Sequence, residues 1–419
     1  RNDWSSTLPP DNWSFFYPSF GLNVVLSDLV NMPSWVTFFK LRGSWAQVGN
    51  DTSPYQLDRT AAVSAGGRNG FLTLSGTLPN ENLLPEETVS TEIGADLRFF
   101  RNRLGLDITW YKSNSRNQLF SVALPVGSGA SQFFTNGGDV ENTGVEAILN
   151  ITPIETPSFS WDLSFNFTRN RSTVLEINDE RPRIQIASDF LRAYFIEEGE
   201  LFGNVYSRGF VRDDQGRVIV GADGLPQITP GRTVKVANFN PDWLGGIRNY
   251  FRWNNFNLSF LIDIRQGGST ASITDAIIFG DGLVDQTLEG REGGIFGQDY
   301  YTDVTAVKED GSPNDIETDS EAFWRLVGGR NAPVGEVFAL DASNIRLREL
   351  VFGYRLPLSS GPLKAISLSL VGRNLFFFSN KAETLDPELI VGTGKAAEGF
   401  ESFAPPTSRS IGFNLKLDF

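Results

Sequence analysis

The chain contains no cysteine and no histidine, and these two absences remove much of the chemistry that proteins perform with side chains. Without cysteine there are no disulfide frameworks and no thiol nucleophiles, and without either residue most zinc sites are excluded. Catalytic triads built on a Ser-His pair are excluded as well. The sequence therefore gives no support to an enzyme, and we expect neither catalytic residues nor a bound cofactor.

Long hydrophobic runs are also missing. A helix that crosses a membrane needs roughly 20 consecutive apolar residues, and the strongest apolar runs, such as Leu375 to Phe378, are far shorter. Because only helices and closed barrels satisfy their backbone hydrogen bonds in lipid, any membrane crossing by this chain must use strands. The segment Arg1 to Ser6 is polar and does not resemble a signal peptide, so we interpret the chain as a mature or truncated piece.

Positive charge is scarce relative to negative charge, since the net charge is −14. No cluster of lysine and arginine is long enough to follow a phosphate backbone, which argues against nucleic acid as a partner. The excess of acidic residues instead indicates solvated loops.

Glycine and aromatic residues are abundant, with 42 glycines, 34 phenylalanines and 9 tryptophans in 419 residues. Polar and apolar residues alternate along the end of the chain, which predicts a strand with two different faces. One face carries Ile411, Phe413, Leu415, Leu417 and Phe419, and the other carries Ser410, Gly412, Asn414, Lys416 and Asp418. A final strand that ends on an aromatic residue resembles the last strand of bacterial outer-membrane proteins.

The same alternation recurs upstream, and the uncharged face can be followed from strand to strand. The apolar sets are Ile93, Ala95, Leu97 and Phe99; Leu104, Leu106, Ile108 and Trp110; Val145, Ala147, Leu149 and Ile151; Phe159, Trp161, Leu163, Phe165 and Phe167; and Phe256, Leu258, Phe260, Ile262 and Ile264. A soluble sheet would bury this face in a core, whereas a membrane barrel would turn it to lipid and keep the polar face towards a wet lumen.

Three features favour the membrane barrel. The runs are about ten residues long, which matches a tilted transmembrane strand. Aromatic residues lie at the ends of the runs, as at Trp110, Trp161, Trp253 and Phe419. Short links at 101–103, 153–157, 254–255 and 358–364 alternate with long ones at 49–86, 119–140, 172–242, 267–344 and 378–407. Outer-membrane barrels have short periplasmic turns and long extracellular loops, so we assign the long connections to the cell surface.

Counting back from Phe419 gives about eleven strands. They are predicted at 16–27, 36–48, 87–100, 104–118, 141–152, 158–171, 243–253, 256–267, 344–357, 365–377 and 408–419. The apolar stretch Leu201 to Val211 would break the alternation of short and long links as a single spanning strand, so it belongs to an extracellular loop or to an unresolved pair. An open sheet would leave two unpaired edges in lipid, which is costly. We therefore infer that an N-terminal portion of the barrel is missing or is supplied by a separate chain.

Seven segments in order along the chain resemble the C-terminal half of the barrel of SusC/RagA-type TonB-dependent transporters. They are Leu41 to Asn50 (LRGSWAQVGN), Asn80 to Leu97 (NENLLPEETVSTEIGADL), Asn142 to Glu146 (NTGVE), Asp242 to Asn249 (DWLGGIRN), Leu258 to Gly268 (LSFLIDIRQGG), Asp341 to Tyr354 (DASNIRLRELVFGY) and Gly372 to Leu375 (GRNL). The resemblance covers nearly the whole chain. The plug domain, the TonB box and the first half of the barrel have no counterpart in the sequence.

The resemblance implies an all-β fold in which residues 1–419 form the C-terminal part of an antiparallel transmembrane barrel of about 22 strands. It implies a cell outer-membrane importer of oligosaccharides or peptides in Bacteroidota-like bacteria, capped by a SusD-like surface lipoprotein and driven by the TonB complex through a plug. Its other partners would be the remaining barrel strands and the outer-membrane lipid. The alternative is a structural or adhesive surface protein that reuses the barrel without active transport. The sequence does not identify the transported substrate.

Candidate ligand contacts lie in two of the predicted loops. Aromatic residues that could stack on sugar rings or contact a substrate are Phe133, Phe134, Tyr300, Tyr301 and Trp324. The loop at 267–344 also contains Asp299, Asp303, Asp315 and Asp319, which could hold a calcium ion with oxygen ligands. These acids lack the spacing of a calcium-binding loop, so a solvated acidic loop is the competing interpretation.

Other conspicuous segments have a plainer interpretation. The motifs RGSWAQVGN, RQGG and RLREL are interpreted as strand-end and loop-packing signatures, with direct ligand contact as the alternative. The polar faces of the predicted strands carry Glu92, Asp96, Asp107, Glu146 and Asp162. A wet lumen accounts for these carboxylates, and their presence alone does not support a glycosidase.

Overall fold

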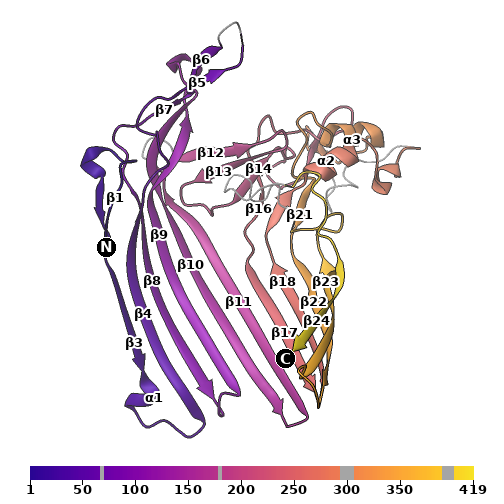
Figure 1. Cartoon of the computed structure of the whole chain (residues 1–419). Helices are drawn as coiled ribbons and strands as arrows, with labels where there is room; N and C mark the ends of the chain where they lie inside the picture. Colours follow the sequence, from indigo (N-terminus) through magenta and orange to yellow (C-terminus); the bar gives the residue numbers. More distant parts are fainter. Residues whose placement is uncertain (67–69, 178–181, 293–305, 389–400) are drawn as a thin grey trace. The chain divides into compact units, whose positions relative to one another are not determined.

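The computed structural model describes residues 1–66, 70–177, 182–292, 306–388 and 401–419 (Figure 1). Its contacts divide the chain into two compact units. The first comprises Arg1–Pro153, Ser164–Ile184 and Ile196–Phe202, and the second comprises Ile154–Leu163, Gln185–Phe195 and Gly203–Phe419. Among the described residues, no helix is both long enough and apolar enough to cross a membrane.

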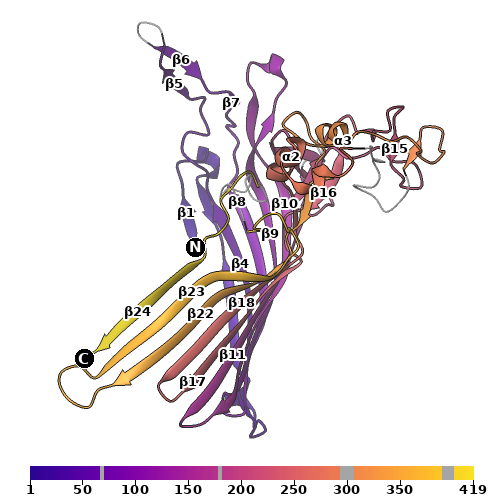
Figure 2. The same cartoon turned by 90° about the vertical axis from the view of Figure 1, so that its right-hand side faces the viewer.

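Eleven strands follow one another through the principal sheet in the order of the sequence, which confirms the predicted number. The strands of the first unit are β3 (Ser19–Val25), β4 (Val36–Asn50), β8 (Glu86–Phe99), β9 (Leu104–Ala123), β10 (Gln132–Glu155) and β11 (Phe159–Glu176). The first residues of β11 belong to the second unit. The second unit continues with β17 (Trp243–Trp253), β18 (Phe256–Gln266), β22 (Asn344–Pro357), β23 (Ala365–Asn380) and β24 (Ser410–Asp418), which lie side by side in Figure 2.

The pairing within each unit is that of a meander. In the first unit the pairs β3–β4, β4–β8, β8–β9 and β9–β10 are antiparallel. In the second unit the pairs β17–β18, β18–β22, β22–β23 and β23–β24 are antiparallel. A short strand, β7 (Thr77–Leu78), adds a parallel pairing to the start of β10. The two-residue link at 254–255 is a tight hairpin in which Asn254 has a φ of 50°, a conformation that asparagine tolerates well.

The remaining elements are short and belong to the connections. In the first unit they are β1 (Asn2–Trp4), η1 (Pro10–Asn12), β2 (Ser14–Phe16), α1 (Leu26–Leu29), β5 (Ala61–Ser64), β6 (Phe71–Leu74) and η2 (Val126–Ser128). Two strands, β12 (Arg183–Ser188) and β13 (Arg192–Glu197), have residues in both units. The short elements of the second unit are β14 (Asn204–Ser207), β15 (Ile219–Val220), β16 (Val234–Asn238), β19 (Ser269–Ala271), α2 (Ile273–Gly280), η3 (Asp285–Leu288), β20 (Val307–Lys308), α3 (Ser320–Val327) and β21 (Ala339–Asp341).

The two faces of the sheet differ as the alternation predicts. Apolar side chains such as Ile93, Phe352 and Leu370 are 50–59% exposed on one face. The opposite face of the first unit carries ion pairs, including the two-pronged contact of Arg42 with Asp107, whose two N–O distances are 2.5 and 2.9 Å. A barrel with this sheet as its wall would therefore present an uncharged surface to lipid and a charged surface to its lumen.

Aromatic side chains gather where strands meet their short links. In the first unit, Trp35 stacks on Phe99 and Phe100 with ring centroids 5.6 and 6.2 Å apart. In the second unit, Phe256 contacts Trp253, Phe352 and Tyr354 with centroids 4.7 to 6.2 Å apart. Such clusters are typical of the aromatic girdle that marks the interface between lipid and water.

The largest buried core of the second unit lies in its long connections and not in the principal sheet. Fourteen buried residues form this cluster, among them Phe210, Val218, Phe323, Trp324 and Phe338. They come from the segments between β12 and β22, which include α2 and α3. The connections predicted as loops therefore fold together into an ordered layer with its own core.

Two connections differ in detail from the prediction. The segment 119–140 was expected to be a long loop, but β9 and β10 stay paired as far as Ala123 and Gln132, which leaves a link of eight residues. The strands extend because their pairing resumes beyond Asn117 and Gly138, which the ladder skips, and continues past the predicted ends of the membrane-spanning runs. The stretch Leu201 to Val211 contributes β14 to a separate four-stranded sheet, β12-β13-β14-β16, and does not enter the principal sheet.

Candidate functional site

Two arginines two residues apart on β22 hold the segment that follows β23. Arg346 forms ion pairs with Asp386 (3.1 Å) and Glu388 (2.9 Å). Arg348 pairs with Asp263 of β18 at 2.5 Å and donates to both carboxylate oxygens of Glu388. The register of β22 against β23 shifts on both sides of Arg346, and such bulges re-aim side chains. The arginines thus fasten 386–388 to the polar face of β18 and β22.

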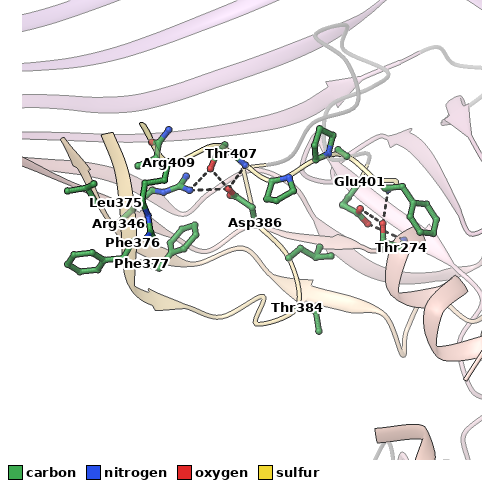
Figure 3. A pocket seen from close by; sticks show the side chains of 16 residues that line it. Thr274, Arg346, Leu375, Phe376, Phe377, Thr384, Asp386, Glu401, Thr407 and Arg409 are labelled. Carbon is green, nitrogen blue, oxygen red and sulfur yellow. Dashed lines mark hydrogen bonds and ion pairs between the residues drawn. The ribbon is translucent and has the colours of Figure 1, made fainter. Parts of the chain in front are cut away.

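The pair of Arg346 with Asp386 is buried, since both side chains are 4% exposed. The ring of Phe377 on β23 covers the guanidinium, with 4.2 Å between the ring centroid and Cζ. Thr407 joins the same pair, because it donates from its backbone N–H and its hydroxyl to Asp386 and accepts from Arg346. Segments on either side of the undescribed residues 389–400 are therefore tied to one arginine (Figure 3).

The local environment of Asp386 lowers the pKa of its carboxyl. Burial alone would raise this pKa, but hydrogen bonds from Thr407 and from the backbone N–H of Glu388, together with the charge of Arg346, outweigh it. The carboxylate is consequently held in its charged form, as an ion pair with Arg346 requires.

A second anchor lies at the start of α2. The carboxylate of Glu401, which is 2% exposed, accepts from the Ser272 hydroxyl (2.6 Å), the Thr274 backbone N–H (3.2 Å) and the Thr274 hydroxyl (2.5 Å). The backbone carbonyl of Glu401 accepts from the buried Arg192 at 3.0 Å. A carboxylate is favoured at this position because it meets unsatisfied N–H groups and the positive end of the helix dipole.

Asp275, in the first turn of α2, lies close to this anchor. Its Oδ2 accepts from the Thr384 hydroxyl at 2.8 Å, and its Oδ1 has no hydrogen-bond partner among the described residues. Burial raises the pKa of this carboxyl and the nearby charge of Glu401 raises it further, against the effect of the Thr384 hydrogen bond. Asp275 therefore favours its neutral form more than an exposed aspartate does.

A cavity of about 750 Å³ lies between these two anchors (Figure 3). Its wall on the strands is Arg346, Asn374, Leu375, Phe376 and Phe377, and the segments beside them contribute Thr384, Leu385, Asp386, Phe403, Ala404, Pro405, Pro406, Thr407 and Arg409, with Thr274 and Glu401 from the second anchor. The lining combines apolar rings with a few charged groups, as is typical of sites for small ligands. This cavity is our candidate functional site.

A further cavity of about 980 Å³ lies beside α2 and α3. Trp324, one of the residues predicted to contact a ligand, lines it and packs against Phe279 with ring centroids 4.9 Å apart. Trp324 is 6% exposed and belongs to the buried core of the connections. The structure gives this residue a packing role, and its contact with a ligand stays a prediction.

Phe133 and Phe134 line neither of these two cavities. Phe133 and Phe134 are half-buried at the start of β10, opposite Val122 and Ser121 of β9. Tyr300 and Tyr301 lie outside the described residues, as do Asp299 and Asp303. Their contact with substrate also stays a prediction.

The described acids of the predicted calcium loop have other partners. Asp315 pairs with Lys308 at 2.5 Å, and Asp319 caps α3 by accepting from the backbone N–H of Glu321. In the part of the chain that the structure describes, no three acidic residues come together in a way that could hold a metal ion. A calcium ion in this loop remains a hypothesis.

Sequence reasoning did not single out Asp386, Glu388, Glu401 or Arg409. The RLREL motif was interpreted as a packing signature, and its two arginines do pack a loop against the wall. A signal was present in the matched spacing, since Arg-x-Arg at 346–348 meets Asp-x-Glu at 386–388. Nothing in the sequence indicated that these two motifs would meet in space.

Comparison with known proteins agrees with the fold. Residues 1–187 match the family model described as TonB dependent receptor-like, beta-barrel. The chain is 26% identical to TonB-dependent receptor P3 of Formosa agariphila, over 93% of this chain and 40% of the relative. It is 27% identical to TonB-dependent receptor P39 of the same organism, over the whole chain and 44% of the relative.

Two further matches are to a relative named SusC and to a solved structure. The chain is 24% identical to TonB-dependent receptor SusC of Bacteroides thetaiotaomicron, over the whole chain and 41% of that protein. A solved structure of the RagAB peptide transporter matches the whole chain with a TM-score of 0.77 at 20% identity, over 45% of the matched chain. The chain thus spans less than half the length of these relatives. The resemblance inferred from the sequence motifs is confirmed.

Proposed function

This chain carries a β-barrel of the TonB-dependent receptor type, similar to SusC, and on that premise we propose that it builds the wall and surface loops of an outer-membrane importer. The plug domain and the remaining barrel strands would come from other parts of the transporter. The TonB complex would act on that plug to drive import, and this chain would perform no bond chemistry.

One observation carries the proposal. Eleven successive strands in one sheet present an uncharged, exposed face on one side and paired charges on the other. A soluble protein would bury such a face, since large exposed apolar patches are rare on monomers. Within the described residues, β3 and β24 each pair on one side alone in the sheet order. Strands from the rest of the transporter would complete the ladder in a barrel of about 22 strands.

The likeness to SusC and to a structure of the RagAB peptide transporter supports a surface lipoprotein of the SusD type as a partner. The RagAB structure is named as a peptide transporter, which supports peptides as the imported class, and oligosaccharides are the alternative that the resemblance of the sequence motifs implies. The ordered connections around α2 and α3 supply a surface on which such a lid could rest. The relatives are named as receptors, which agrees with a role without catalysis.

The orientation of the sheet can be tested with nitroxide labels, because the chain has no cysteine of its own. Leu370→Cys and Ser369→Cys place labels on opposite faces of β23 in the full-length protein in lipid vesicles. We expect the label at 370 to be relaxed by dissolved oxygen and the label at 369 by a water-soluble nickel chelate. Equal accessibility of both labels to the nickel chelate would contradict a membrane wall.

Import itself is tested in the native bacterium. Deletion of the gene that encodes this chain should abolish growth on the substrate of the transporter, found by screening peptide and glycan mixtures. Deletion of TonB should give the same loss. A deletion strain that grows normally on every mixture, with the protein present in the outer membrane of its parent, would favour a structural surface protein instead.

A further inference from the structure

The cavity beside β22 and β23 contains one cation that its surroundings leave without a partner. Arg409 lies at its edge, directly before β24, and its guanidinium makes no ion pair or hydrogen bond with any described residue. Figure 3 draws it beside Thr407 and Arg346. Its position on the cavity wall makes this charge available to a ligand.

The two acidic residues that line the cavity, Asp386 and Glu401, could pair with Arg409 only by breaking their present hydrogen bonds and ion pairs. Asp386 is paired with Arg346 and accepts from Thr407, and Glu401 accepts from Ser272 and Thr274. Arg346 also lines the cavity, and its buried Nε has no hydrogen-bond partner among the described residues. Because that Nε is buried and the Phe377 ring covers the guanidinium, Arg409 is the donor that a ligand can reach, and an anionic or acceptor group is favoured beside it.

The rest of the lining is largely apolar. Leu375, Phe377, Phe403, Pro405 and Pro406 supply rings and aliphatic groups between the charged ends. The cavity volume of about 750 Å³ lies in the range of sites for small ligands. A sugar ring can stack on the aromatic rings, but its hydroxyls would find few partners beside Leu375, Pro405 and Pro406, whereas the apolar side chains of a short peptide would cover these groups.

We propose that this cavity binds the terminal carboxylate of a short peptide substrate, with the guanidinium of Arg409 as the group that receives it. The inference rests on the proposed import function and narrows its substrate class. The carboxylate lies against Arg409 and the peptide side chains lie against Phe403 and the two prolines. Thr274 and Thr384, whose hydroxyls are engaged within the protein, mark the far end of the cavity.

Binding to the purified full-length transporter in detergent tests the proposal by calorimetry. The probes are the acetylated tripeptide Ala-Phe-Ala with a free carboxyl end and the same peptide as its amide. We expect the acid to bind about tenfold more tightly, which corresponds to about 1.4 kcal/mol. Arg409→Gln should remove the difference, and Arg409→Lys should keep part of it. Arg252→Gln makes the same change of charge on an exposed arginine of β17 and should leave it intact.

Trigalacturonic acid carries carboxylates on sugar rings and has no apolar side chains. It therefore tests whether the cavity prefers the carboxylate of a peptide to that of a sugar acid. It should bind more weakly than the peptide acid. Equal affinity of the wild-type protein for peptide acid and amide, or an unchanged difference in Arg409→Gln, would overturn the proposal, as would tighter binding of the sugar acid. Each of these outcomes leaves import itself intact, because import is judged by growth of the deletion strain.

Discussion

Arg346 of β22 and Asp386 of the segment after β23 form a 3.1 Å ion pair in which both side chains are 4% exposed. Forty residues separate them in the sequence, and the pair ties a surface connection to the barrel wall. Breaking a buried pair by removing one partner costs about 3–5 kcal/mol, whereas replacing both partners with apolar groups can be neutral. The difference in stability between the single and the double replacement can be measured.

Arg346→Met should loosen the connection at Asp386, because it removes the cation that pairs with this buried carboxylate, while Arg348 keeps its pair with Glu388. We expect amide hydrogen exchange in residues 382–388 to become at least about a hundredfold faster, since each 1.4 kcal/mol is a factor of ten. Mass spectrometry of the exchanged full-length protein gives the measurement. The double variant Arg346→Met with Asp386→Leu should recover part of the protection.

Arg355→Met is the matched control for this change. Arg355 also lies on β22, but its pair with Asp418 is 3.4 Å long and its side chain is 61% exposed. Exposed pairs contribute about 0–1 kcal/mol, so exchange in 382–388 should not change. Equal acceleration in both variants would mean that the buried pair does not anchor the connection.

The lowered pKa of Asp386 predicts how the anchor responds to acid. A carboxyl with a lower pKa in the folded state stabilises that state above its unfolded pKa of about 3.9, and the contribution is lost as the pH falls through the folded value. Protection of 382–388 should therefore persist at pH 5 and fall below about pH 4. In Asp386→Asn protection should already be low at pH 5, and a wild-type protein that loses protection between pH 7 and pH 5 would refute this.

Asp275 predicts the opposite trend at the second anchor. A carboxyl whose pKa is raised in the folded state favours folding fully below its unfolded pKa, and this contribution is lost as the pH rises through the folded value. Glu401 is the charged group that faces it, and Thr384 donates to it. We expect hydrogen exchange in α2 of the wild type to be slower at pH 4 than at pH 7.5, after correction for intrinsic rates.

Asp275→Asn replaces this carboxyl with a neutral amide of the same shape. The variant should show no such difference between pH 4 and pH 7.5, and its α2 should exchange no faster than the wild type at pH 7.5. Thr384→Val keeps the carboxyl and removes its hydrogen-bond donor, so its dependence on pH should increase. If α2 in the wild type and in Asp275→Asn responds identically to pH, the assignment to Asp275 is wrong.

The strands could be predicted from the sequence because each has an independent, local signal. Alternation along 256–264 and 411–419 marks the face that must stay uncharged, and the predicted strands agree with β18 and β24 to within two residues. The ends of β9 and β10 were missed because a hairpin can extend beyond the membrane wherever its backbone ladder continues, and Phe133 and Phe134 lie in that extension. No membrane constraint sets the pattern there.

The candidate site could not be predicted in the same way. Its residues come from β22, β23, α2 and the segment around 401–409, and they meet because Arg346 and Glu401 each find a partner far away in the sequence. A single arginine or glutamate in a loop sequence carries no sign of its partner. Trp324 was singled out as an aromatic residue in an acidic loop, and such composition does not distinguish a ligand contact from the core position that it occupies.

The contact between α2 and the segment after α3 depends on glycine. A Cβ atom at Gly280 would lie 2.1 Å from the backbone nitrogen of Gly329, so the two segments could not keep their distance. We expect Gly280→Ala to increase the susceptibility of residues 281–292 to protease and to lower the melting temperature of the connections. Gly127→Ala is the control, since its Cβ would meet nothing within 4 Å.

Arginine substitutions at positions 370 and 369 of β23 distinguish a membrane wall from a soluble sheet, because their effects on the free energy of unfolding should differ. Leu370 is 58% exposed on the uncharged face, whereas Ser369 belongs to the opposite face. An arginine that faces lipid near the middle of the bilayer costs about 2–4 kcal/mol, and a substitution that faces the lumen affects stability little. Leu370→Arg should therefore lower the free energy of unfolding of the full-length transporter in phospholipid vesicles by about 2 kcal/mol or more, while Ser369→Arg should change it by less than about 1 kcal/mol.

Urea titration followed by tryptophan fluorescence measures both free energies of unfolding. The same titration in detergent should reduce the difference, because micelles adapt to a buried charge. Equal costs at the two positions would mean that the apolar face of β23 does not meet lipid.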